Sequence, residues 1–290
     1  MAIDERVMLR FSCATVSLPT VAVEDAPALL REIGLAGIEW RVGEHPAAMG
    51  SSAERFLTDN RCTLAPTVEA AVRARELCAE AGIAIVGLAP YIAIGDLDAL
   101  ATALDMARAA GAPLVRLQGA RPGRSLGYRE ALAATEAFLA GAVPLAARAG
   151  VKLGLEMHQD TVAPSASMAA RLVRPFDPRH LGVIYDAGNL IFEGYVRHGL
   201  GLEVLGAHLA HVHLKNATIA PPERRPGVWR PRWAPLDDGA IDVPAFLRAL
   251  RQVGYGGWVS LEDLSTERTP VETLRHNAEV LRATGELVAV

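Results

Sequence analysis

The chain has 290 residues, of which 51% are hydrophobic and 21% are charged, so it can build a large core and is not typical of a disordered protein. A net charge of −4 and the lack of a long basic run argue against a protein that binds duplex nucleic acid through its phosphates. The length exceeds that of most single domains, but α/β barrels of this size commonly fold as one domain.

The sequence repeats one unit, in which an amphipathic, alanine-rich helix and a glycine-bearing turn lead into a short apolar strand. In chain order, strands are expected at 9–18, 38–42, 83–91, 114–120, 151–158, 181–188, 211–216 and 258–264. Helices are expected at 26–37, 68–82, 97–113, 128–150, 167–180, 201–210, 243–257 and 270–284. Strands that alternate with helices in this way predict parallel βαβ units.

Eight such units predict an α/β fold of the (β/α)8 TIM barrel type, as a single domain over residues 1–290. The alternative is an open, doubly wound sheet, which usually carries a glycine-rich phosphate turn after its first strand. Here the first strand runs into "SCATVSLPT", and neither that turn nor a P-loop is present in the sequence. The segment at about 217–238, which contains proline, arginine and tryptophan, is expected to be a long loop after the seventh strand.

Polar residues stand at the C-terminal ends of four consecutive strands. Side chains alternate along a strand, so the apolar residues of "VKLGLEMH" face the helices while Glu156 and His158 face the barrel axis. The same alternation turns inward the polar residues of three later strands: Asp186, His211, His213, Lys215 and Glu262. Active sites of barrel enzymes lie at the C-terminal ends of the barrel strands, so these residues are candidates for one site.

Three carboxylates that converge in a barrel repel one another unless a positive group compensates them. A divalent metal ion does this directly, with an imidazole as a fourth ligand. Three oxygen donors and one nitrogen favour Mn²⁺, with Mg²⁺, Co²⁺ or Zn²⁺ as alternatives. Each residue also has an ordinary structural explanation, as a surface charge, a turn former or a core histidine, but the joint pattern indicates a metal site.

The most specific stretches are "LGLEMH", "VIYDAGN", "HVHLKN" and "PLDDGAIDVPAFLRALRQVGYGGWVSLED". With these, nearly the whole chain resembles the xylose isomerase-like barrels of the sugar phosphate isomerase/epimerase family. The resemblance implies that Glu156, Asp186, His213 and Glu262 bind one divalent metal. In the family pattern the second histidine of "HVH" is the ligand, which favours His213 over His211.

The resemblance implies a divalent-metal-dependent isomerase or epimerase of a keto/aldo sugar or polyol. Glu156 and Glu262 would remove and return a proton through a metal-stabilised enediolate. One alternative is a lyase or dehydratase that uses the same enolisation, of inosose or dehydroshikimate dehydratase type or cleaving oxidised glycosides. Another is a non-catalytic barrel subunit. Related AP endonucleases carry a histidine where this chain has Asn189, which argues against DNA repair.

Four side chains are expected to contact a carbohydrate substrate: His158, Asn189, Lys215 and Arg116. Each has a structural alternative: a hydrogen bond to a ligand for His158, and an internal ion pair for the two cations. On the second strand, Glu39 and Arg41 share a face and are expected to pair with each other.

The remaining expectations concern assembly and location. Trp229 and Trp233 of the long loop could form a lid over a sugar or pack in an interface, because such barrels commonly form homodimers or homotetramers. Cys13, Cys62 and Cys78 are odd in number and lack CxxC spacing, which is typical of a reduced, cytoplasmic protein. Without a signal peptide or an apolar segment long enough for a bilayer, we expect no membrane partner.

Overall fold

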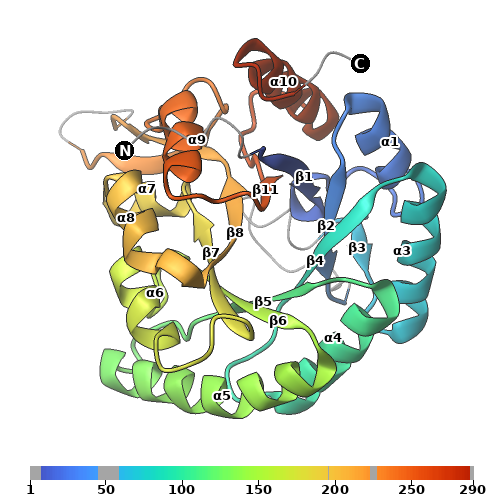
Figure 1. The fold of residues 1–290 in the computed structure, drawn as a ribbon. Helices are drawn as coiled ribbons and strands as arrows, with labels where there is room; N and C mark the ends of the chain where they lie inside the picture. Colours follow the sequence, from blue (N-terminus) through green and yellow to red (C-terminus); the bar gives the residue numbers. More distant parts are fainter. Residues whose placement is uncertain (1–7, 45–58, 195, 223–226, 288–290) are drawn as a thin grey trace.

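The computed structural model describes residues 8–44, 59–194, 196–222 and 227–287, and it confirms the predicted barrel. Eight parallel strands form a closed ring, because β1 pairs with β2 on one side and with β11 on the other (Figure 1). Around the ring they are β1 (Arg10–Ala14), β2 (Gly37–Val42), β4 (Ala84–Pro90), β5 (Leu114–Gln118), β6 (Lys152–Glu156), β7 (Leu181–Asp186), β8 (Leu209–Leu214) and β11 (Trp258–Leu261). The short β3 (Thr63–Leu64) extends the sheet beside β2.

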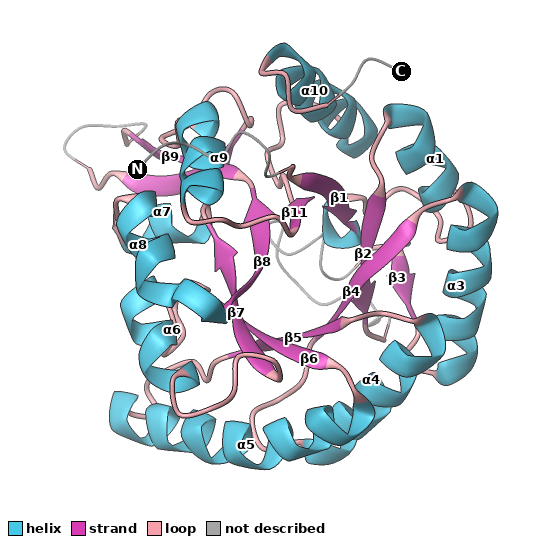
Figure 2. Ribbon diagram, in the orientation of Figure 1, coloured by secondary structure: helices cyan, strands magenta, loops and turns pink. Residues whose placement is uncertain are grey.

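Helices surround the barrel and cover the outer face of its strands (Figure 2). They are α1 (Ala26–Ile33), α3 (Val68–Ala81), α4 (Leu97–Ala110), α5 (Tyr128–Ala149), α6 (Ala166–Val173), α7 (Asn189–Glu193), α8 (His198–Leu205), α9 (Val243–Gln252) and α10 (Pro270–Ala283), with 3₁₀ turns η1 (Thr15–Ser17) and η2 (Gly206–His208). All eight predicted helices are present, and the short α7 is an addition. Gly150 ends α5 with φ 69°, a left-handed conformation that glycine adopts without strain.

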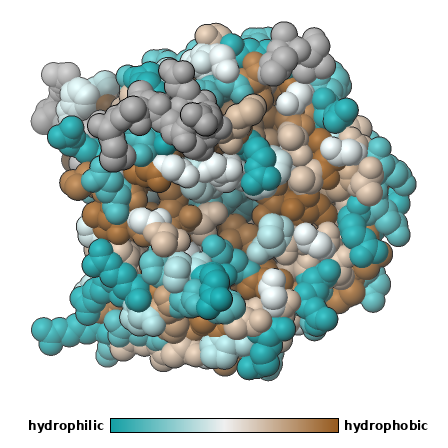
Figure 3. All heavy atoms as spheres, in the orientation of Figure 1, coloured by the Kyte–Doolittle hydropathy of each residue, from teal (hydrophilic) through white to brown (hydrophobic). Residues whose placement is uncertain are grey.

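Among the described residues, α5 is the helix that is long and apolar enough, by length and composition, to cross a membrane. Its buried residues recur every three or four positions, at Ala131, Thr135, Phe138, Ala142 and Ala146. That spacing is typical of a helix that packs one face against a sheet. In the view of Figure 3, hydrophilic side chains gather toward the periphery of the molecule and apolar atoms nearer its middle.

The segment at about 217–238 was expected to be a loop, and this prediction is wrong for residues 217–220 and 230–234. β9 (Asn216–Ala220) and β10 (Arg230–Ala234) pair as an antiparallel ribbon, with Ala220 opposite Arg230 and Asn216 opposite Ala234. Proline lacks the amide donor that a central strand needs, so a proline-rich segment does not suggest a strand. In a two-stranded ribbon both strands are edges, and Pro231 opposite Ile219 is tolerated there.

Candidate metal centre

The four predicted ligands converge inside the barrel. Glu156, Asp186, His213 and Glu262 each offer an atom, and these atoms all lie within 4.8 Å of one another. Nδ1 of His213 is 3.3 Å from Glu156 Oε1, 3.7 Å from Asp186 Oδ2 and 3.7 Å from Glu262 Oε2. All four side chains are buried. The imidazole thus faces three carboxylates across a space that an ion could share.

The strand register explains this convergence. The parallel pairing places Asp186 at the end of β7 beside His213 of β8, and Glu156 ends β6 beside β7. One layer below, Gly154 leaves room for the side chain of Ile184, because a Cβ at Gly154 would lie 2.7 Å from Ile184 Cγ1. The ligand-bearing strands can therefore approach closely beneath the cluster.

Two buried cations compensate the carboxylates. Arg116 Nη1 donates to Glu156 Oε2 at 3.0 Å, and Gln118 Nε2 donates to the same oxygen at 2.9 Å. Lys215 Nζ is 2.8 Å from Asp186 Oδ2 and also donates to Glu262. Burial raises the pKa of Glu156, but the charge of Arg116 and the hydrogen bond from His213 outweigh it and hold that pKa well below its usual range.

His213 carries the opposite shift. Burial lowers the pKa of its imidazole, but the charges of Glu39 and Glu262 and the contacts with the carboxylates of Asp186 and Glu156 raise it well above the ordinary value. Without a metal the imidazole therefore holds a second proton that a metal ion would replace. This environment attracts cations, which is what a metal site requires.

The donor set fits a divalent ion. The backbone N of Asn189 donates to Asp186 Oδ1 at 2.9 Å, which fixes the carboxylate and leaves Oδ2 facing the cluster. Asp186 Oδ2 lies 2.8 Å from the ammonium of Lys215, a cation whose place a metal ion could take. Three carboxylate oxygens and one imidazole nitrogen suit a fairly hard divalent metal.

The residues predicted to contact substrate differ in their burial and in their hydrogen-bond partners. His158 is half-buried, with Nδ1 2.9 Å from the carbonyl of Gln159 and 3.4 Å from Arg121 Nη2. Asn189 is buried; its Nδ2 donates to the carbonyl of Met157, while its Oδ1 accepts nothing from the described residues. The two predicted cations, by contrast, are held against the ligand carboxylates.

The aromatic residues after β8 also differ from one another. Trp233 packs against Phe192 with ring centroids 4.4 Å apart, and Lys215 Nζ lies 4.8 Å from the centroid of the same indole. Trp229 is 55% exposed. Of the two, Trp233 therefore contacts the surroundings of the cluster.

Sequence reasoning missed part of the site. The hydrogen bonds that the structure gives Glu39 go to His211 and His213, whereas pairing with Arg41 was expected. Gln118 was missed although it shares the inward phase of Arg116 on β5, a signal that could have revealed it. No local pattern points from Glu39 to a histidine that lies 174 residues away along the chain.

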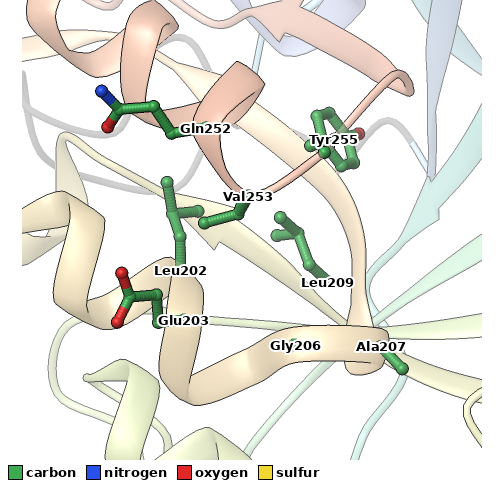
Figure 4. Close-up of a pocket in the computed structure, with 9 residues that line it drawn as sticks. Leu202, Glu203, Gly206, Ala207, Leu209, Gln252, Val253 and Tyr255 are labelled. Carbon is green, nitrogen blue, oxygen red and sulfur yellow. The ribbon is translucent and has the colours of Figure 1, made fainter. Parts of the chain in front are cut away.

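A separate pocket lies at the other end of the barrel strands. Its volume is about 730 Å³, and it is lined by the end of α8, the turn before β8 and the turn after α9 (Figure 4). Its lining includes the apolar side chains of Leu202, Leu209 and Val253, the ring of Tyr255 and the carboxylate of Glu203. Leu209 begins β8, whereas His213 lies near its end, so this pocket is not the candidate metal centre.

Comparison with known proteins agrees with the barrel fold. The profile of the xylose isomerase-like TIM barrel family matches residues 27–284. The chain belongs to this family. The inosose dehydratase of Geobacillus thermodenitrificans (strain NG80-2) is 30% identical over 133 residues, which span 41% of this chain and 42% of that relative. The match thus covers less than half of the length of this curated relative.

Many solved structures share the fold of this chain, including those of IolI and YcjR. The IolI protein, solved with a bound zinc atom, has a TM-score of 0.71 at 16% identity and covers 97% of this chain and 100% of its own. The 3-keto-D-glucoside 4-epimerase YcjR from E. coli has a TM-score of 0.68 at 17% identity, covering 95% of this chain and 99% of its own. At these identities the likeness shows the barrel fold.

Proposed function

We propose that the protein is a divalent-metal-dependent enzyme that moves a proton on the carbon next to a carbonyl group of a sugar or cyclitol. The observation that carries this proposal is the convergence of Glu156, Asp186, His213 and Glu262 within 4.8 Å. Such a cluster is costly unless a cation shares it, and a fold built only for stability has no need of it. The curated relatives and solved neighbours, which include dehydratases and epimerases, support chemistry of this kind.

The four residues would hold the ion. Mn²⁺ is our first choice from the donor set, with Mg²⁺, Co²⁺ or Zn²⁺ as alternatives, and the zinc atom of the IolI structure supports a divalent ion in such a barrel. When bound, the ion supplies a Lewis acid that polarises a carbonyl oxygen and acidifies the neighbouring C–H bond. The remaining chemistry belongs to the side chains of this chain.

The two proposed proton-transfer carboxylates differ in their hydrogen bonds. Glu156 Oε2 accepts from both Arg116 and Gln118, which makes it a weak base. The charged partners of Glu262 are Lys215, which donates to its Oε2, and His213, whose Nδ1 is 3.7 Å from the same oxygen; no guanidinium or amide side chain of the described residues donates to it. We therefore assign removal of the substrate proton to Glu262 and its return, in an isomerase or epimerase, to Glu156.

The polar residues around the cluster would orient the substrate. Asn189 Oδ1, buried and without a hydrogen bond from any described residue, suits a substrate hydroxyl. His158 would contact a second hydroxyl from the end of β6. Lys215, released from the carboxylates when an ion takes its place, would reach a substrate oxygen, while Arg116 would act on the substrate through Glu156. The substrate wall would include Trp233.

Return of the proton gives an isomerase or epimerase, which is our first candidate. A second candidate is a dehydratase, which four curated relatives named inosose dehydratase favour. Loss of water requires an acid that protonates the departing hydroxyl. His158 in its doubly protonated form suits this task, because the carbonyl of Gln159 can accept from Nδ1–H and leave Nε2–H to protonate the departing hydroxyl.

The experiment is incubation with Mn²⁺ in D₂O and a panel of ketoses, inososes and 3-keto-glycosides, followed by mass spectrometry. Deuterium uptake in an otherwise unchanged or epimerised sugar supports the first candidate, and loss of water or aglycone supports the second. Glu262→Gln should slow exchange at least about 100-fold, while Glu267→Gln, an exposed carboxylate after the same strand, should not. A metal-loaded wild-type protein that exchanges no proton on any of these compounds would contradict the proposal and favour a non-catalytic barrel.

We also propose, separately from the enzymatic function, that the protein forms a homo-oligomer. Formation of a homodimer or homotetramer would bury three exposed apolar residues on β9 and just before β10: Ile219, Val228 and Trp229. Sedimentation of the full chain tests it, and a monomer at high concentration would contradict it.

A further inference from the structure

A second row of polar groups lies inside the barrel below the candidate ligands. Nε2 of His213 is 2.9 Å from Glu39 Oε2, so the two ring nitrogens of this imidazole face different partners. Glu39 stands on β2, and two strands, β1 and β11, lie between β2 and β8 in the ring. The carboxylate therefore reaches His213 across the barrel interior, where it is fully buried.

Glu39 is also the centre of a longer hydrogen-bonded chain. Its Oε2 is 3.1 Å from His211 Nε2, which in turn is 2.9 Å from Ser260 Oγ. Ser260 Oγ is 2.7 Å from Ser12 Oγ. All of these side chains are buried, so neither bulk water nor salt competes with the contacts. The chain thus gives Glu39 Oε2 a second buried partner besides His213.

The chemistry of imidazole gives this contact a consequence. A metal ligand must present an unprotonated ring nitrogen, and the neutral ring has one such nitrogen and one N–H. An ionised carboxylate only accepts hydrogen bonds, so beside Nε2 it favours the form with the proton on Nε2. The contact of 2.9 Å between His213 Nε2 and Glu39 Oε2 has the ordinary length of an N–H···O hydrogen bond, so Glu39 acts here as the acceptor.

We infer that Glu39 is a positioning residue, which keeps the proton of His213 on Nε2 and thereby presents Nδ1 to Glu156, Asp186 and Glu262. The inference rests on the proposed metal site. Carboxylates that orient a metal-binding histidine in this way also make the ring a stronger ligand, and their loss typically costs about 10- to 100-fold in metal affinity. His211, which resembles the ligand in sequence, acts in this arrangement as a partner of Glu39.

A rival interpretation is a second ion between Glu39, His211 and His213, which also offer atoms within 4.8 Å of one another. Two ions would then share the ring of His213, which would have to lose both of its protons. The contacts of 2.9 and 3.1 Å to a single oxygen of Glu39 are ordinary lengths for N–H···O hydrogen bonds. We therefore assign hydrogen bonds to this row and one ion to the chain.

The test compares the wild type with Glu39→Gln and with Ser12→Ala, a buried variant at the far end of the same hydrogen-bonded chain. Zn²⁺ affinity and stoichiometry are measured by competition with a chelator and by elemental analysis. Long-range ¹H–¹⁵N spectra of the zinc-loaded protein show which nitrogen of His213 binds the metal and whether Nε2 keeps a slowly exchanging proton. Circular dichroism reports whether each variant is folded.

We expect one ion per wild-type chain, bound through Nδ1 with a protected Nε2–H. Glu39→Gln should bind Zn²⁺ about 10- to 100-fold more weakly and lose that protection, whereas Ser12→Ala should stay within about twofold. If Glu39→Gln does not fold, Glu39→Asp replaces it, because the shorter side chain keeps the charge but not the reach, and the same loss is expected.

The failures are distinguishable. A wild-type protein that binds no Zn²⁺ overturns the proposed function together with this inference. A wild type that binds one ion, with unchanged affinity and Nε2–H protection in the Glu39 variants, overturns the inference alone. Two ions per wild-type chain, reduced to one by Glu39→Gln, would establish the rival second site.

Discussion

Replacing Arg116 by Met should destabilise the metal-free protein more than any exposed arginine replacement. The guanidinium is 3.0 Å from Glu156 Oε2, and the two side chains are 5% and 1% exposed. At an effective dielectric constant of about 20, two unit charges at this separation attract by about 5 kcal/mol. Removal of one partner from a buried pair typically costs about 3–5 kcal/mol, because the other charge is left unpaired. Since Gln118 still donates to Glu156, we expect about 3 kcal/mol.

The assay is urea denaturation in EDTA, with Arg275→Met as the control. Arg275 Nη2 is 2.8 Å from Glu32 Oε1, a similar distance, but both side chains are about half exposed, so its loss should cost at most about 1 kcal/mol. Added Mn²⁺ should restore part of the loss in Arg116→Met, since an ion gives Glu156 a new positive partner. A metal-free Arg116→Met protein within about 1 kcal/mol of the wild type would refute the reasoning.

Three further predictions concern other sites. Burial lowers the pKa of His198 to about 4, below the ordinary 6.5, so the unfolded chain takes up the proton first. The stability of the wild type should therefore fall by up to about 3 kcal/mol as the pH drops from about 6.5 to 4, and urea denaturation of His198→Phe should lack this fall. Burial raises the pKa of Cys13 to about 12 and of Cys78 to about 11, and that of Cys62 further, so Ellman's reagent at pH 8 should titrate three thiols only after unfolding. A Cβ at Gly188 would lie 2.5 Å from Lys215 Cγ and 3.1 Å from the Lys215 carbonyl oxygen, so Gly188→Ala should cost about 1–3 kcal/mol in thermal unfolding; an unchanged melting temperature would contradict this.

The fold was predictable because each unit carries its own local signals. The apolar strand, the helix period and the glycine at the helix end are all contained within about 30 residues, and they agree with one another. The same alternation that defines β6 also gives the direction of Glu156, so the inward phase of the ligands could be predicted. Their convergence follows from closure of the ring, which the count of units already implied.

What could not be predicted depends on contacts between distant segments. The direction of Glu39 follows from the phase of β2, but its partners on β8 depend on how deep each side chain lies and on which strands face one another across the barrel. The β9–β10 ribbon was hidden because local composition indicates a loop, while pairing between 216–220 and 230–234 decides the conformation. Both cases are tertiary interactions that override a local preference.

The ligand cluster also bears on how the barrel is held together. Its members lie on β6, β7 and β8 and directly after β11, four neighbouring strands of the ring, and they span residues 156 to 262. A bound ion would cross-link four β/α units, so that no unit could detach without breaking a coordinate bond. Chelation would then loosen the second half of the barrel before the first, and hydrogen exchange in β6 to β11 would report that order.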